Sequence, residues 1–194
     1  MNARLTLLVA LGLSATPAAA TPPEVAFDIH SIAPTPAPRV MVTGLADTPA
    51  ELAPQSGKVL LIAFWATWCD ACRAEIPGLM ALGRALQARH PGRFRVVGVS
   101  MDQELGAVKT YLRQLPRRGP PSWTVFLDSP NQTALAAYYT AARATDIPDE
   151  YQLPQAYFVD RAGALVGWLE GPRDWSNPAA RAYLESLLRG TSHP

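Results

Sequence analysis

Cysteine and histidine are scarce in this chain of 194 residues, which has two cysteines and three histidines. A structural zinc site needs about four ligands, and no histidine stands at ligand spacing from the cysteines. A disulfide framework needs more cysteines and is typical of much smaller chains. We therefore expect neither a stapled scaffold nor a bound metal or cofactor.

Blocks of charge of one sign are also absent. The chain has 17 basic and 16 acidic residues, and its formal net charge is +1. Proteins that bind nucleic acid usually carry a clustered basic surface. Nucleic acid is therefore not expected as a partner.

The apolar run Leu5–Leu13 is shorter than the roughly 20 residues that a transmembrane helix needs. Arg4 precedes this run, and three alanines end at Ala20, which is the pattern of a signal peptide cleaved after that residue. We expect residues 1–20 to direct export to the periplasm, with an uncleaved membrane anchor as the open alternative. No cysteine lies near the cleavage site, which excludes a lipid anchor on cysteine.

Proline is concentrated after this leader, from Thr21 to Gly57. Repeated proline blocks both helix and ladder hydrogen bonds, so residues 21–39 are predicted to form an extended N-terminal arm. A short edge strand is predicted at Val40–Thr43. The folded domain is expected to span residues 40–190, with 191–194 as a tail.

The domain alternates between buried-strand and helical patterns, which predicts an α/β fold with a central mixed sheet flanked by helices. The first central strands are expected to be parallel, and a final hairpin to be antiparallel. Strands are predicted at 59–65, 94–100, 123–128, 156–160 and 164–169, and helices at 70–89, 103–115, 133–144 and 178–189.

Both cysteines lie in the string F-W-A-T-W-C-D-A-C-R-A-E-I-P, where a strand passes into a helix. At a helix N-terminus the free N–H groups and the helix dipole lower the pKa of a thiol. Cys69 is thus expected to attack a substrate disulfide, and Cys72 to resolve the mixed disulfide. A haem attachment site would need histidine where the chain has Arg73. A structural disulfide and a metal site remain open as minor alternatives.

This string resembles the thioredoxin-fold signature and, more narrowly, the TlpA/ResA group of exported thioredoxin-like proteins. Residues 97–102 are similar to the strand that follows the active-site helix in this group. Residues 171–180 resemble its G-x-x-D-W-x-x-P-x-A segment. The resemblance covers about residues 40–190 and implies a thioredoxin-like fold that exchanges disulfides with protein substrates, with Trp68 shaping the surface of the site.

The resemblance implies further site residues. Leu153-Pro154 matches the cis-proline loop opposite the cysteines, which binds the substrate chain, although the group often has Thr or Val where this chain has Leu153. Glu75 matches an acidic residue that transfers a proton during exchange. Thioredoxins proper carry a buried Asp where this chain has Ala63, so Glu75 is the natural substitute. Pro77 matches a structural helix proline.

The residues between the cysteines indicate the direction of exchange. Asp70 places a negative charge beside Cys69 and opposes the thiolate, an effect that Arg73 partly offsets. We expect a potential nearer to that of thioredoxin, about −270 mV, than to that of the oxidant DsbA, about −120 mV. This favours a reductase, for which the family implies a DsbD/CcdA-like membrane thiol donor and clients in cytochrome c maturation or copper-site assembly. The protein is expected to be a monomer.

Alternative functions are a disulfide oxidase or isomerase, a Sco-like copper metallochaperone and a peroxiredoxin-type peroxidase. The metallochaperone pattern needs C-x-x-x-C with a distal histidine, and the chain has C-x-x-C. The peroxidase pattern P-x-x-x-T-x-x-C is absent, because Ile62 and Ala66 occupy its Pro and Thr positions. An acidic insert at 145–152 is predicted to be a solvated loop.

Overall fold

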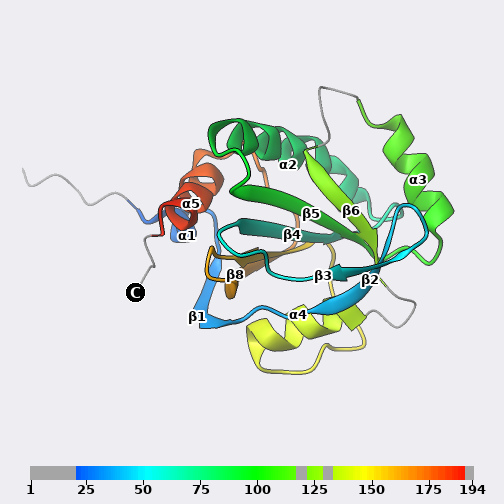
Figure 1. Ribbon diagram of the computed structural model, residues 1–194, viewed down its shortest axis with the longest axis horizontal. Coiled ribbons are helices and arrows are strands. Elements are labelled where there is room, and N and C mark those ends of the chain that lie inside the picture. The colour runs from blue at the N-terminus through cyan, green and yellow to red at the C-terminus, as the bar shows by residue number, and fades with distance from the viewer. Residues whose placement is uncertain (1–20, 117–121, 129–132, 191–194) are drawn as a thin grey trace, which may run out of the picture.

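The computed structural model describes residues 21–116, 122–128 and 133–190. The proposed signal peptide and tail lie outside this part of the chain. One eight-stranded mixed sheet forms its centre, in the order β1-β8-β7-β4-β5-β6-β2-β3 (Figure 1). The strands are β1 (His30–Pro36), β2 (Val40–Gly44), β3 (Pro49–Leu52), β4 (Val59–Trp65), β5 (Phe94–Ser100), β6 (Trp123–Leu127), β7 (Gln155–Val159) and β8 (Ala164–Glu170).

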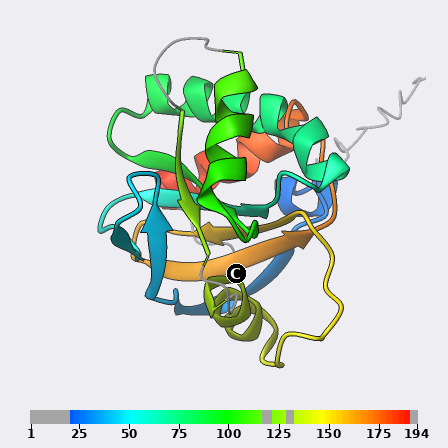
Figure 2. The same ribbon diagram turned by 90° about the vertical axis from the view of Figure 1, so that its right-hand side faces the viewer.

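Helices cover both faces of this sheet, as predicted. The helices are α1 (Pro23–Ala26), α2 (Asp70–Arg89), α3 (Leu105–Gln114), α4 (Thr133–Arg143) and α5 (Pro178–Arg189). Helices α2, α3 and α5 lie on one face, and α4 lies alone on the other (Figures 1 and 2).

The position of β4 in the middle of the sheet explains why its sequence is entirely apolar. All seven residues of β4 are buried, because helices cover both of its faces. Strand β4 runs parallel to β5, and β5 runs parallel to β6. Strands β7 and β8 form the predicted antiparallel hairpin, and β7 also pairs antiparallel with β4.

Residues 21–39, predicted to form an extended N-terminal arm, contain a helical turn as well as an extended strand that joins the sheet. Residues 23–26 form a helical turn, and β1 pairs antiparallel with β8. Proline is compatible with this pairing because β1 is an edge strand with one open side. Its register also shifts between Ser31 and Thr35, around Pro34. The segment is therefore part of the sheet.

The other edge of the sheet also differs from the expectation. Strand β2 was predicted as an edge strand, but it lies between β6 and the unpredicted strand β3. The four residue pairs of β2 and β3 run from Val40–Leu52 to Thr43–Pro49. Strand β3 contains a proline and a glutamate, which weakened its strand pattern in the sequence.

Candidate functional site

The two cysteines form a disulfide at the N-terminus of α2, with an S–S distance of 2.09 Å. Cys69 is the N-cap residue of the helix, and Cys72 lies in its first turn. Cys69 retains 9% of its surface, whereas Cys72 has none exposed. An incoming group can therefore reach the first sulfur more easily than the second.

The helix terminus provides a hydrogen bond to the sulfur of Cys69. The backbone N–H of Cys72 donates to Sγ of Cys69 at 3.1 Å. Such a donor stabilises the charged form of the sulfur once the disulfide is reduced. Asp70 and Arg73 form an ion pair on the exposed side of the same turn, so the charge of Asp70 is compensated locally.

A buried carboxylate holds the loop that leads to Cys69, and sequence reasoning missed it. Asp102 is 7% exposed and accepts hydrogen bonds from the backbone N–H and the hydroxyl of Thr67, at 2.9 and 2.5 Å. The hydroxyl of Ser100 also donates to Asp102, at 2.6 Å. The available signal was that Asp102 follows β5, whose carboxyl end lies beside that of β4.

Trp68 stands on the surface next to this disulfide. Its side chain is 64% exposed, which is unusual for a large apolar residue that adjoins a buried cysteine. Exposed aromatic side chains are common at the centre of protein interfaces. The position fits the predicted contact with a partner.

Glu75 lies one turn beyond Cys72 on α2 and is 9% exposed. The backbone N–H of Arg173 donates to Oε2 of Glu75 at 2.9 Å. Burial raises the pKa of Glu75 from 4.5 to about 7, and the hydrogen bonds and charge around it reduce this effect only in part. The carboxyl group can therefore gain or lose a proton near neutral pH.

An open groove of about 610 Å³ lies beside Glu75. One wall is the first part of α2, and the other is the segment 171–175 before α5. The groove is lined by Ala71, Ala74, Glu75, Gly78, Pro172, Arg173, Asp174 and Trp175.

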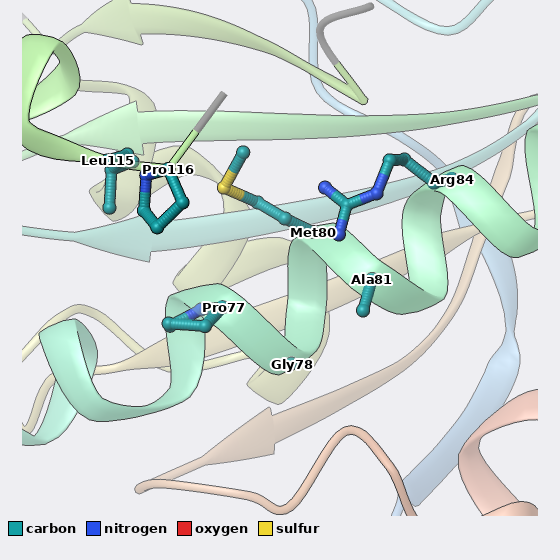
Figure 3. A pocket seen from close by; sticks show the side chains of 7 residues that line it. All are labelled: Pro77, Gly78, Met80, Ala81, Arg84, Leu115 and Pro116. Carbon is teal, nitrogen blue, oxygen red and sulfur yellow. The ribbon is translucent and has the colours of Figure 1, made fainter. Parts of the chain in front are cut away.

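A second hollow, of about 390 Å³, lies between α2 and the residues that follow α3 (Figure 3). It is lined by Pro77, Gly78, Met80, Ala81, Arg84, Leu115 and Pro116. Among the described residues that line it, Arg84 is the only one with an ionisable side chain. These described residues offer no acid, base or nucleophile, so the groove beside Glu75 is the better candidate for the site. Helix α2 continues through Pro77 to Arg89.

The Leu153–Pro154 peptide bond is cis, as predicted. Gln155, the next residue, pairs with Phe64 near the end of β4. Leu153 and Pro154 therefore lie at the end of the sheet from which the loop to Cys69 departs. The backbone N–H of Gly171 donates to the carbonyl of Pro154 at 2.9 Å, which connects this loop to segment 171–175.

The acidic side chains Asp146, Asp149 and Glu150 are exposed, as expected for a solvated loop. Within the described ranges, no three His, Cys, Asp or Glu side chains gather as a metal site. In the same part of the chain, no helix has the length and hydropathy needed to span a membrane.

Comparisons with known proteins agree with this geometry. The AhpC/TSA family matches residues 34–167. The thiol-disulfide oxidoreductase ResA of Bacillus cereus is 25% identical over 151 residues, which are 78% of this chain and 76% of ResA. The thiol:disulfide interchange protein HelX of Rhodobacter capsulatus is 26% identical over 71% of this chain and 65% of HelX.

A crystal structure from Chlorobium tepidum, of a thiol:disulfide interchange protein of the thioredoxin family, superposes with a TM-score of 0.61. It is 25% identical and covers 81% of this chain and 98% of its own. Fold and site together define a thioredoxin-fold protein of the thiol-disulfide oxidoreductase class. The chain belongs to the AhpC/TSA family, and its resemblance to the TlpA/ResA group is confirmed by the likeness to ResA and HelX.

Proposed function

We propose that this protein is an exported protein-disulfide reductase in which Cys69 and Cys72 are the catalytic pair. The observation that carries the proposal is the asymmetry of the disulfide. Cys69 caps a helix and keeps an exposed edge, while Cys72 is fully buried behind it. This arrangement suits one sulfur that meets substrates and one that acts only within the protein.

The reaction begins with the reduced pair. The thiolate of Cys69 attacks one sulfur of a substrate disulfide, and the other substrate sulfur leaves as a thiolate. Cys72 then loses its proton and attacks Sγ of Cys69, which breaks the mixed disulfide and releases the second substrate thiol. Two electrons pass to the substrate, and the protein is left with the Cys69–Cys72 disulfide.

Glu75 is the group proposed to handle the proton of Cys72. It lies one turn away on the same helix, and its pKa of about 7 allows it to accept a proton at neutral pH. Once protonated, it can return that proton to a leaving sulfur. Ala63 leaves β4 without the acidic residue of thioredoxins proper, so no competing carboxylate stands there.

Trp68, Leu153 and Pro154 are proposed to bind the substrate chain. Trp68 offers an exposed aromatic surface beside Cys69. Leu153 and Pro154 lie at the same end of the sheet. A substrate cysteine held between these two elements would be presented to Cys69.

The setting of this reaction is also a proposal. Residues 1–20 are proposed to export the protein to the periplasm, where a membrane thiol donor of the DsbD/CcdA kind would reduce it again. Clients would be cysteines of apocytochrome c or of copper-site assembly factors. The names of ResA, HelX and the DsbE homolog of Paracoccus denitrificans support thiol-disulfide exchange, while the donor and the clients rest on the resemblance to the TlpA/ResA group.

The midpoint potential of the Cys69–Cys72 couple tests the direction of exchange. The protein is equilibrated in dithiothreitol and glutathione buffers, and tryptophan fluorescence reports the oxidised fraction. We expect a two-electron titration with a midpoint potential of about −270 mV. A midpoint potential of about −120 mV would instead make the protein an oxidase or isomerase.

Cys72→Ser is the control for this titration. It removes the intramolecular disulfide and should abolish the two-electron transition. A titration that persists in this variant would show that the fluorescence reports another event.

A further inference from the structure

Segment 171–175, which forms the wall of the groove that contacts Glu75, packs on its other side against Phe27 and Asp28 of the N-terminal segment. Segment 171–175 lies against α2, since a Cβ atom added at Gly78 would stand 3.6 Å from Cβ of Trp175. On its other side, the ring of Trp175 packs on that of Phe27 with centroids 5.3 Å apart. Arg173 also forms an ion pair with Asp28, at 2.8 Å.

These contacts form a continuous path from the start of the folded chain to the disulfide. Asp28 binds the guanidinium of Arg173, and the backbone N–H of Arg173 binds the carboxylate of Glu75. Glu75 lies one turn from Cys72 on α2. The side chain of Arg173 is 20% exposed, whereas that of Asp28 is 77% exposed, so Asp28 can be changed with little effect on packing.

We propose that Phe27 and Asp28 are positioning residues for Glu75, which hold segment 171–175 in place over its carboxylate. The inference rests on the proposed function in one respect, namely that Glu75 takes part in disulfide exchange. It assigns the N-terminal segment a task at the site, although this segment lies outside the region expected to form the domain.

The charges around Glu75 set the sign of the expected effect. Arg173 and Asp174 face it from segment 171–175, while Asp70 and Arg73 pair with each other earlier on α2. Asp28 compensates the charge of Arg173. Without Asp28, the guanidinium attracts the Glu75 carboxylate more strongly, and a looser segment also admits water to it. Both effects favour the ionised carboxylate and lower its pKa. A weaker hydrogen bond from the backbone N–H of Arg173 acts in the opposite direction, but burial is the largest cause of the raised pKa, so its relief decides the sign.

The test is a carbon NMR titration of the Glu75 carboxyl group in the oxidised protein, assigned with Glu75→Gln. In Asp28→Asn the titration midpoint should fall by about one pH unit or somewhat less. The control is Glu51→Gln, which removes another exposed ion pair, Arg39–Glu51, at the opposite edge of the sheet. This control should leave the midpoint unchanged.

A double-mutant cycle shows whether Asp28 acts through Arg173. Asp28→Asn should have no additional effect on the midpoint once Arg173→Gln is present. An equal effect in both backgrounds would overturn the proposal, as would a midpoint in Asp28→Asn that matches the Glu51→Gln control.

The effect of Asp28→Asn on disulfide exchange is measured separately. The rate at which the reduced protein reduces a glutathionylated peptide is measured at a series of pH values. The midpoint of this pH–rate profile should shift in the same direction as the NMR midpoint. If the midpoint moves and the rate profile does not, the positioning role stands and the catalytic role of Glu75 fails. The two proposals can therefore fail independently.

Discussion

At the scale of single residues, Glu75 ties the chemistry of the site to the stability of the fold. Its pKa is raised from 4.5 to about 7, with burial as the main cause. The folded state therefore holds a proton that the unfolded state releases between these two values. Stability from this group is complete below about pH 4.5 and is lost as the pH rises through about 7.

Glu75→Gln is expected to remove this pH dependence. A neutral amide costs less to bury than a carboxylate, and its oxygen can still accept the N–H of Arg173. At pH 8 the oxidised variant should be more stable than the unmodified protein, by up to about 3 kcal/mol. At pH 4 the difference should be small.

Urea unfolding of both oxidised proteins at these two pH values measures the effect. Glu185→Gln is the control, because it changes a glutamate on α5 whose ion-pair partner, Arg89 at the end of α2, is exposed. Equal pH dependence in the unmodified protein and Glu75→Gln would show that Glu75 ionises normally.

Asp102 is the second residue that supports the site, because it holds Thr67 two positions before Cys69. An asparagine has only one acceptor oxygen and cannot satisfy the same three donors. Asp102→Asn should lower the free energy of unfolding by about 1–3 kcal/mol. It should also slow disulfide exchange, since the loop before Cys69 loses its anchor.

The exposed Asp146→Asn is the matched control for this substitution. Chemical denaturation and the exchange rate of both variants are the measurements. A variant of Asp102 that exchanges at the normal rate would mean that the loop does not depend on this carboxylate.

At the scale of secondary-structure elements, α1 and β1 form a structural unit with the rest of the domain. Strand β1 covers the edge of β8, and Phe27 and Ile29 are both buried. Burying two large apolar side chains contributes about 3 kcal/mol or more. The segment is therefore expected to be essential for stability, in contrast to a proline-rich arm that makes no contact.

A protein that begins at Ala37 should be less stable than one that begins at Pro23, by at least about 3 kcal/mol. The longer truncation removes α1 and β1, whereas the shorter one keeps both elements. Unfolding by urea compares the two, and hydrogen exchange of the β8 amides that face β1 reports whether the edge of β8 is open. Equal free energies of unfolding would show that the segment does not stabilise the folded domain.

At the scale of the whole molecule, the predicted fold class is confirmed, whereas several contacts between segments distant in the sequence were not predicted. The apolar run of β4, the cysteine spacing and the cis-Pro154 motif are contained in short stretches of sequence. The ladder of β1 depends on β8, more than a hundred residues later. Likewise, Asp102 acts on Thr67 across 35 residues, and Arg173 acts on Glu75 across 98. No local pattern reports such pairs.

Export is the remaining prediction at this scale. Helix α1 starts at Pro23, so cleavage after Ala20 would leave every described element intact. The full chain, produced in a bacterium with an outer membrane, should appear in the periplasmic fraction with Thr21 as its first residue. Ala20→Arg should block this processing, and mass spectrometry of both proteins decides the matter. An intact N-terminus in the unmodified protein would favour the anchor.

The prolines that weakened the strand pattern of both edge strands also affect how the sheet can pair with other polypeptide chains. Strand β1 carries Pro34 and Pro36, and strand β3 at the opposite edge begins with Pro49. Proline has no N–H to offer to an added strand, so each open edge is a poor template for further pairing. The proposed reaction brings the protein into repeated contact with cysteine-containing substrate chains. Proline at both edges of the sheet should disfavour the pairing of such a chain as an added strand.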